Sequence, residues 1–318
     1  MNHNNAPMNL GNGHLDTLLP YLFRPVKKQA YQRERIETPD NDFLDLDWVK
    51  GGHRKLLIIS HGLESSSKAQ YVQGMADLFK QHEFDVLAWN YRGCSGAVNR
   101  TMKYYHSGAS EDLATVVEHV ESLQAYDSVF LMGFSLGGNL TLKYAGEQSD
   151  AIAESIKGVC VFSTPCYLKT ASHQLAKGFN KIYTQNFVRS LKQKVYDKRA
   201  LLEANGFDLA DIDKLNSLPT FDDVFTAPMH GFKDADDYYQ QCSATFFMPD
   251  IRVPTLIVNA ANDPFLSKEC YPYQLVDDNP CLQMEVPKHG GHVGFYQPLK
   301  GNVMWSEARA LAFVQSLL

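Results

Sequence analysis

The sequence lacks the features that mark several classes of protein. It has no run of about 18 apolar residues that could cross a bilayer as a helix. Its six cysteines form no C-x-x-C pair and no Cys/His cluster with the spacing of a zinc site. The first residues, 1–10, are polar and rich in asparagine, without the basic start and apolar run of a signal peptide. We therefore expect reduced thiols, no metal and a cytoplasmic location.

Positive charge is also scarce. The 318 residues carry 30 Lys and Arg against 36 Asp and Glu, a formal net charge of -6. Proteins that bind nucleic acid neutralise phosphates with clustered Lys and Arg, so this balance argues against a nucleic-acid partner. The densest basic stretch, residues 189–199, is typical of the solvated face of a helix. It indicates a transient contact with a membrane surface only weakly.

Short apolar segments alternate with segments of helical periodicity through most of the chain. This pattern is typical of an α/β protein with a mostly parallel sheet that helices cover on both faces. We predict eight strands, at residues 33–38, 43–49, 56–60, 85–89, 128–132, 158–163, 255–260 and 282–286. The main predicted helices cover residues 72–82, 110–123, 139–148 and 304–318. Ser110 is expected to cap the second of them.

The connection between the sixth and seventh predicted strands is too long for an ordinary loop. Residues 164–254 carry helical patterns and many aromatic residues. We interpret them as a helical cap inserted after the sixth strand, with residues 1–163 and 255–318 forming the core domain. The aromatic residues are expected to form the small core of this cap, and some of them to line an apolar acyl pocket above the sheet.

The strongest local signal for chemistry is the segment Gly133-Phe134-Ser135-Leu136-Gly137, between a predicted strand and a predicted helix. A nucleophile elbow needs this context, because its serine occupies a strained turn that lifts the hydroxyl clear of the sheet. The start of the following helix offers backbone N–H groups to a developing oxyanion. Ser135 is therefore the candidate nucleophile, and the Leu136 N–H is one candidate oxyanion donor.

A serine hydroxyl needs a base that accepts its proton and an acid that orients this base. After a nucleophile elbow, the expected order along the chain is serine, acid, histidine. Asp263 fits the acid because it follows the seventh strand, and His292 fits the base because it lies in a glycine-rich loop after the last strand. The rival acids, Asp277 and Asp278, fall in a predicted helix. The rival base, His289, lies closer to the strand.

The second oxyanion donor is expected in the loop after the third strand, His61-Gly62-Leu63-Glu64. Gly62 allows a close approach of the backbone, and the Leu63 N–H is the natural donor. The alternative is a simple turn at the end of a strand, but the elbow elsewhere in the chain argues against it. Because a triad supplies its own nucleophile and base, we predict no cofactor and no metal.

These motifs resemble the YheT-like branch of the α/β hydrolases along nearly the whole chain. The resemblance rests on GNGHLDT (11–17), HGLE (61–64), NYRGCSG (90–96), GFSLGGN (133–139), NDPF (262–265) and HGGHVGF (289–295). It implies the α/β-hydrolase fold, a charge relay through Ser135, Asp263 and His292, and an esterase or lipase type of activity on acyl esters. Two positions depart from the branch: Asp16 replaces the usual Gln, and Ser65 replaces a frequent Gly.

We therefore predict a serine hydrolase that cleaves a small-molecule acyl ester or a lipid through an acyl-enzyme intermediate. A thioesterase or an amidase is the alternative among enzymes. A non-catalytic ligand-binding protein is the alternative from another class, because a fold does not by itself determine a function.

Overall fold

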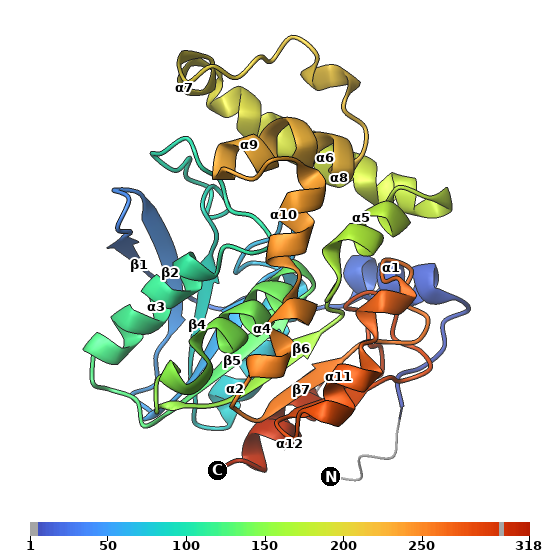
Figure 1. Ribbon diagram of the computed structural model, residues 1–318. Helices are drawn as coiled ribbons and strands as arrows, with labels where there is room; N and C mark the ends of the chain where they lie inside the picture. Colours follow the sequence, from blue (N-terminus) through green and yellow to red (C-terminus); the bar gives the residue numbers. More distant parts are fainter. Residues whose placement is uncertain (1–5, 299–301) are drawn as a thin grey trace.

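The computed structural model describes residues 6–298 and 302–318 (Figure 1). Residues 1–5 belong to the polar stretch for which we predict no signal peptide, and they lie outside the described residues. Among the described residues, no helix combines the length and the apolar character needed to cross a bilayer.

The described strands form one sheet of 8 in the order β1-β2-β4-β3-β5-β6-β7-β8. Their bounds are β1 (Gln32–Glu37), β2 (Phe43–Val49), β3 (Lys55–Ser60), β4 (Asp85–Asn90), β5 (Ser128–Phe134), β6 (Ile156–Phe162), β7 (Thr255–Val258) and β8 (Leu282–Glu285). The strand β2 runs antiparallel to β1 and to β4, and the other neighbouring pairs are parallel. The predicted fold class, an α/β fold with a mostly parallel sheet, is confirmed.

Helices cover both faces of this sheet. Those that flank it are α2 (Gln70–Gln81), α3 (Ser110–Ser122), α4 (Leu136–Gln148), α11 (Tyr273–Asp278) and α12 (Trp305–Gln315). Buried residues of α2 and α12 pack on one face, and those of α3 and α4 pack on the other. The parallel strands are therefore buried on both faces, which explains why they read as continuous apolar runs.

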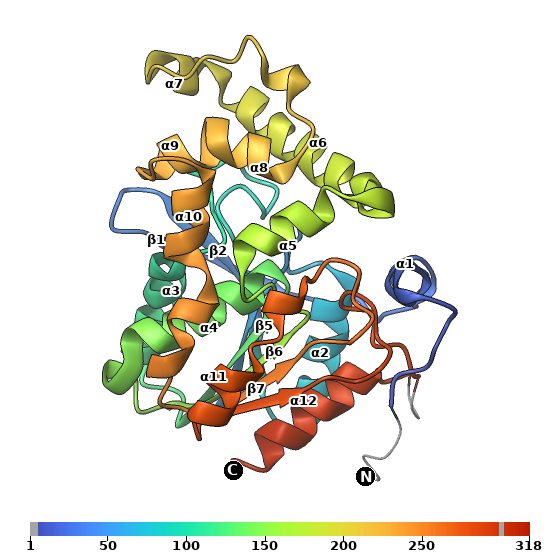
Figure 2. The same ribbon diagram turned by 45° about the vertical axis from the view of Figure 1, so that its right-hand side comes forward.

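The segment between β6 and β7 folds into further helices above the edge where the parallel strands end (Figures 1 and 2). They are α5 (Leu168–Leu175), α6 (Lys181–Asp197), α7 (Arg199–Ala204), α8 (Leu218–Phe221), α9 (Ala227–His230) and α10 (Ala235–Cys242). A π-helical turn, Asp222–Thr226, joins α8 to α9. Phe221 and Phe225 pack with Val195 and Leu202 in a small cluster of this segment. The division of the chain into a core and a cap stays a prediction.

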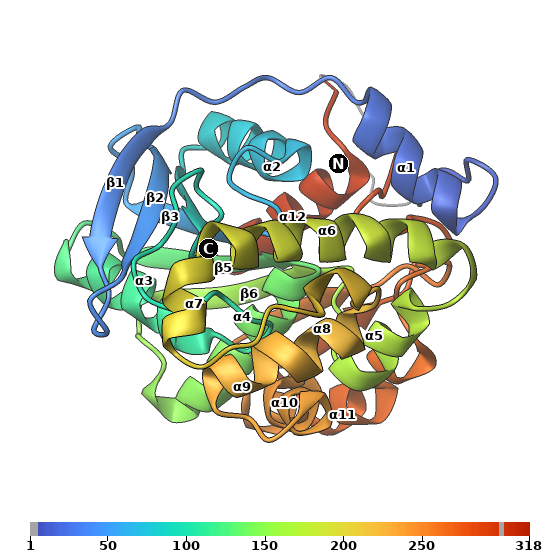
Figure 3. The same ribbon diagram turned by 90° about the horizontal axis from the view of Figure 1, so that it is seen from above.

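The N-terminal helix α1 (Gly13–Phe23), for which we predict no element, lies beside the first turn of α6 in the view from above (Figure 3). The side chain of Asn12 caps it by accepting the backbone N–H groups of His14 and Leu15 at 3.0 Å. This cap explains where the helix starts.

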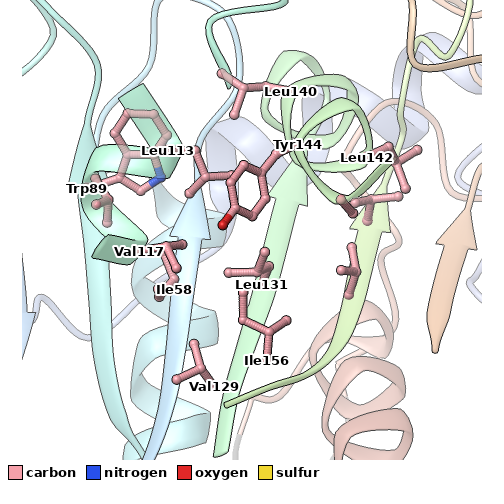
Figure 4. Packing of buried hydrophobic residues seen from close by; sticks show 14 of the residues in the cluster. Ile58, Trp89, Leu113, Val117, Val129, Leu131, Leu140, Leu142, Tyr144 and Ile156 are labelled. Carbon is pink, nitrogen blue, oxygen red and sulfur yellow. The ribbon is translucent and has the colours of Figure 1, made fainter. Parts of the chain in front are cut away.

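Alternation along the strands divides the core into two layers. Leu56 and Ile58 of β3 belong to the cluster under α3 and α4, whereas Leu57 and Ile59 belong to the cluster under α2 and α12. Successive side chains of a strand point to opposite faces, so each strand contributes to both layers. Figure 4 shows the first layer, where Ile58 lies among side chains from α3 and α4.

Two helix starts differ from the prediction. The helix after the elbow begins at Leu136 instead of residue 139, because Ser135 itself is the N-cap residue. Ser110 is the first residue of α3 and not its cap, and the Ala109 position before it has no side-chain cap. The Ser110 hydroxyl instead donates to Glu147 of α4.

The prediction that residues 189–199 form a solvated face is wrong for two lysines, Lys194 in α6 and Lys198 at the C-cap of this helix. The ammonium of Lys194 lies 2.6 Å from Glu64, and Lys198 donates to the side chain of Asn99 and, at 2.6 Å, to the carbonyl of Thr101. Burial lowers the pKa of Lys198 to about 8. A charge pattern along one helix cannot reveal partners that the fold brings from distant segments.

Candidate active site

Ser135 occupies the turn between β5 and α4 with a φ of 53° and a ψ of -121°. Non-glycine residues seldom adopt this backbone conformation, and it is a frequent mark of functional sites. The two glycines of the motif make the turn possible. A Cβ atom on Gly133 would lie 2.4 Å from the carbonyl oxygen of Gly137, and one on Gly137 would lie 2.3 Å from that of Ser60. Close packing of backbone therefore requires glycine at both positions.

The side chains of Ser135, His292 and Asp263 form one hydrogen-bonded chain. Nε2 of His292 lies 2.8 Å from Oγ of Ser135, and Nδ1 lies 2.9 Å from Oδ2 of Asp263. A carboxylate only accepts hydrogen bonds, so Nδ1 carries the hydrogen and Nε2 is left to accept the serine hydroxyl. The Asp263 side chain is fully buried, and that of His292 is 9% exposed. The arrangement can transfer a proton from the serine to the imidazole.

Phe265 contacts both the candidate acid and the candidate base. Its backbone N–H donates to Oδ1 of Asp263 at 2.9 Å, and its ring stacks on the imidazole of His292 with 4.1 Å between centroids. The same residue therefore restrains the carboxylate and one face of the base.

The rival acids and base lie elsewhere. Nδ1 of His289 is 4.0 Å from Oδ2 of Asp16, and Asp277 and Asp278 end the exposed helix α11. Within the described ranges, no hydrogen bond joins any of these three rivals to Ser135.

Helix α1 contacts the two loops that carry the acid and the base. The hydroxyl of Thr17 accepts the backbone N–H of His292 at 2.8 Å. The buried carboxylate of Asp16 accepts the side-chain amide of Asn262 at 2.7 Å and the backbone N–H of Leu10 at 2.7 Å. The sequence marks Asp16 only as a departure from a family pattern. A contact across 246 positions of the chain leaves no local signal.

The loop after β3 passes close to the nucleophile. A Cβ atom on Gly62 would lie 3.4 Å from Cβ of Ser135. The Gly62 N–H donates to the hydroxyl of Tyr71 at 2.8 Å, so it is engaged. No acceptor in the described part of the chain takes the N–H of Leu63 or of Leu136, and both residues line the same cavity as Ser135. These two groups are free to donate to a bound ligand.

Neighbouring side chains shape this loop. The Tyr71 hydroxyl donates to Oγ of Ser65 at 2.9 Å. Ser65, which stands where the YheT-like branch frequently has Gly, therefore connects the loop to α2. His61 donates from Nδ1 to the carbonyl of Gly62 at 2.8 Å and accepts the Tyr91 N–H at Nε2. Burial lowers the pKa of His61 to about 3, which keeps its imidazole neutral.

Glu64 connects the loop to α6. Its carboxylate accepts the hydroxyl of Tyr105 at 2.7 Å, the ammonium of Lys194 at 2.6 Å and the hydroxyl of Ser190. The side chains of Glu64 and Lys194 are 4% and 14% exposed. Since a buried charge needs several partners, this set of donors holds Glu64 in place, directly next to Leu63 and its free N–H.

A mostly apolar cavity of about 420 Å³ opens over Ser135. Leu18 and Tyr21 of α1 line one part of it, and Leu168, Leu175 and other side chains of the inserted helices line another part. The expectation that inserted aromatic residues reach such a cavity holds for several of them, namely Tyr183, Phe187 and Tyr239.

Two carboxyl residues, Glu64 and Asp222, interrupt the apolar lining of this cavity. Asp222 lies in the π-helical turn and accepts the hydroxyls of Thr226 and Tyr239, each at 2.6 Å. Burial raises the pKa of Asp222 to about 6.

The strand order, the serine at the turn after β5 and its hydrogen-bonded histidine are features of α/β hydrolases. The family model described as "alpha/beta hydrolase fold" matches residues 55–299, and the chain belongs to this family. Within it, the chain belongs to the YheT branch. It is 33% identical to the putative esterase YheT of Escherichia coli, over 94% of this chain and 88% of that protein.

More distant relatives cover most of the chain as well. The human phospholipase ABHD3 is 26% identical over 90% of this chain and 71% of its own length. The monoacylglycerol lipase of Saccharomyces cerevisiae is 27% identical over 87% of this chain and 62% of its own length. Among solved structures, the Pyrococcus furiosus esterase Pf2001 superposes with a TM-score of 0.60 at 18% identity, covering 92% of this chain and 98% of the esterase. This last likeness concerns the fold.

Proposed function

We propose that this protein is a serine hydrolase that cleaves carboxylic esters through Ser135, His292 and Asp263. The observation that carries the proposal is the unbroken chain of hydrogen bonds from the serine hydroxyl to the buried carboxylate. Relatives named as esterase, phospholipase and lipase support the esterase and lipase type of chemistry.

In the proposed mechanism, Oγ of Ser135 attacks the ester carbonyl carbon while Nε2 of His292 takes the hydroxyl proton. The N–H groups of Leu63 and Leu136 donate to the oxyanion that forms. His292 then gives its proton to the leaving alkoxide, which departs as an alcohol. Asp263 stabilises the imidazolium in between. Water then attacks the acyl-serine while the same histidine takes its proton. The bond between the acyl carbon and Oγ of Ser135 breaks, His292 returns the proton to Oγ, and the carboxylic acid leaves.

The lining of the cavity supports an acyl ester or a lipid as substrate. Apolar side chains above Ser135 favour an acyl chain, because they bury it without unpaired polar groups. We propose that residues 164–254 act as the cap that closes over the acyl chain of the substrate. The six free cysteines support a reducing compartment, the cytoplasm, as the location.

Labelling with a fluorophosphonate probe tests the nucleophile. The folded protein should be labelled at Ser135, and the Ser135→Ala variant should not. Hydrolysis of p-nitrophenyl butyrate should fall by about six orders of magnitude in Ser135→Ala, by analogy with other serine triads. A wild-type protein that neither reacts with the probe nor hydrolyses any ester would contradict the proposal.

A matched pair of substitutions tests the acid. Asp263→Asn should lower kcat by about 10⁴, because the amide orients the wrong tautomer of the imidazole. Asp278→Asn, at the exposed end of α11, should leave kcat unchanged. Equal effects of the two would count against the role of Asp263.

Butyryl derivatives of matched size separate the remaining alternatives. An ester hydrolase should cleave the ester faster than the amide, whereas a thioesterase should prefer the thioester and an amidase the amide. Binding of the ester that is equal in wild type and Ser135→Ala, with no turnover in either, would identify a ligand-binding protein instead.

A further inference from the structure

Six large apolar side chains are exposed on α1 and around the start of α6. In α1 they are Phe23 at 72%, Tyr21 at 69%, Leu22 at 58% and Leu15 at 38% exposed; near the start of α6 they are Phe179 and Ile182, each at 50%. We call these six residues the α1–α6 patch. Gathered apolar side chains on a surface mark a site of interaction more often than scattered ones do.

The two halves of the patch are adjacent in space. The ring of His14 in α1 lies 4.6 Å from that of Phe179 between centroids, and its Nδ1 lies 3.3 Å from the hydroxyl of Tyr183. Figures 1 and 3, seen from two directions, both show α1 near the first turn of α6. These contacts join the start of α1, where Leu15 lies, to the start of α6, whereas Tyr21, Leu22 and Phe23 are at the other end of α1. The patch therefore runs along α1 and continues onto the start of α6.

The charge around this patch is positive, although the protein as a whole is negative. Exposed lysines follow α1 at Lys27 and Lys28 and flank Phe179 at Lys177 and Lys181. Residues 13–31 and 175–187 contain one carboxylate, Asp16, which is fully buried. From outside these ranges, Asp77 of α2 lies 3.7 Å from the ammonium of Lys27, so Lys28, Lys177 and Lys181 supply most of the positive charge. Apolar side chains bordered by lysines are the pattern of a surface that lies in the interface of an anionic bilayer.

The patch also lies at the candidate active site. Leu18 and Tyr21, on the same helix, line the cavity that contains Ser135. A lipid that leaves a bilayer at this patch would therefore reach the serine along apolar side chains. The basic stretch 189–199 is a poorer candidate for the contact, since Lys194 and Lys198 are engaged inside the protein.

We propose that the α1–α6 patch docks on an anionic phospholipid bilayer. Its apolar side chains enter the interface and the four lysines contact the headgroups, with the mouth of the cavity facing the lipid. The docking itself is independent of the chemistry. The delivery of a lipid ester to Ser135 rests on the proposed function.

Vesicle sedimentation with the Ser135→Ala variant of the 318-residue chain tests the docking without turnover. Vesicles of phosphatidylcholine containing phosphatidylglycerol should bind the protein, pure phosphatidylcholine should bind it less, and added salt should weaken the binding. The double variant Leu22→Ser/Phe23→Ser should bind about tenfold or more weakly, because two large apolar side chains no longer leave water. Lys177→Glu/Lys181→Glu should abolish the preference for the anionic lipid.

A control variant separates the patch from general surface apolarity. Val98→Ser/Val224→Ser changes two side chains that are 53% and 44% exposed outside the patch, and it should bind vesicles as the parent does. Absence of vesicle binding, or binding that the patch variants leave intact, would overturn the proposal. So would a dimer that the Leu22→Ser/Phe23→Ser variant dissociates in the absence of lipid, because a second copy would then cover the patch.

Two activity measurements with Ser135 intact complete the test. Leu22 and Phe23 do not line the cavity, so their double variant should hydrolyse dissolved p-nitrophenyl butyrate like the wild type. It should hydrolyse an ester embedded in anionic vesicles about tenfold more slowly. If the wild type hydrolyses no ester, the proposed function fails while the sedimentation result stands by itself. Equal rates of the variant and the wild type on embedded ester would refute the delivery step.

Discussion

Replacing Thr17 by valine tests whether helix α1 positions the imidazole of His292. Valine keeps the shape of the side chain but removes the oxygen that accepts the His292 N–H at 2.8 Å. The Thr17 hydroxyl also donates to the carbonyl of Gly13 at 2.6 Å, so its orientation is fixed within the helix. The substitution therefore deletes one well-defined acceptor.

The size of the effect follows from this lost hydrogen bond. A donor left without its partner costs about 1–3 kcal/mol, and we expect the free energy of unfolding to fall by about 1–2 kcal/mol because Thr17 is only partly buried. The loop of His292 gains freedom at the same time. Since a shift of about 1 Å in a reacting group costs up to about 100-fold in rate, kcat should fall by about 10- to 100-fold. KM should change by less than about threefold, because the binding surface keeps its shape.

The assay is steady-state hydrolysis of p-nitrophenyl butyrate, with stability followed by urea unfolding. Thr17→Ser retains the hydroxyl and should keep kcat within about threefold of wild type. Thr115→Val removes a similar bond, from a threonine hydroxyl of α3 to the carbonyl of Glu111, and Thr115 does not line the cavity. It should leave kcat unchanged. Equal losses in Thr17→Val and Thr17→Ser would refute the reasoning, because the hydroxyl would then be irrelevant.

Three further substitutions probe other contacts of the site. Lys194→Met leaves the buried Glu64 without its cation, so the free energy of unfolding in urea should fall by about 3 kcal/mol, and adding Glu64→Gln should restore most of it. Gly137→Ala places a Cβ atom 2.3 Å from the backbone oxygen of Ser60, so we expect little folded protein or a loss of about 3 kcal/mol or more in the same assay. The pKa of Asp222 is raised to about 6, so the folded state binds a proton at this carboxyl more tightly than the unfolded state does. The stabilisation of the folded state that results is complete below about pH 4 and is lost as the pH rises through 6. Asp222→Asn should therefore be more stable than wild type by about 1–2 kcal/mol at pH 8, with the gain absent near pH 4; an equal difference at both pH values would contradict this explanation.

Local patterns were sufficient for the fold class and for the choice of candidate residues. Apolar runs identified strands because both faces of a parallel sheet are buried, and the prediction of eight strands holds in the described ranges. The glycines around Ser135 are visible in the sequence because a tight strand-to-helix turn tolerates no Cβ atom next to it. Asp263 and His292 could be selected because each follows a strand, and the carboxyl ends of parallel strands share one edge. Their catalytic roles stay proposals.

The start of the helix after the elbow shows the limit of such patterns. Propensity places a helix near residues 139–148, but the backbone of Ser135 decides that the helix begins at Leu136. The boundary matters, because it makes the Leu136 N–H the first of the unpaired donors at the helix start.

The contacts that hold the site together were decided by the tertiary structure alone. Thr17 meets the His292 loop across 275 positions of the chain, and Lys194 meets Glu64 across 130. Sequence periodicity reports which face of an element is buried, because burial repeats with the period of the element. A hydrogen bond between two polar side chains has no period, and it exists only where the packed layers bring its two partners together. The sequence therefore determined most of the elements and the choice of candidate residues, and the packing of those layers determined which other residues contact them.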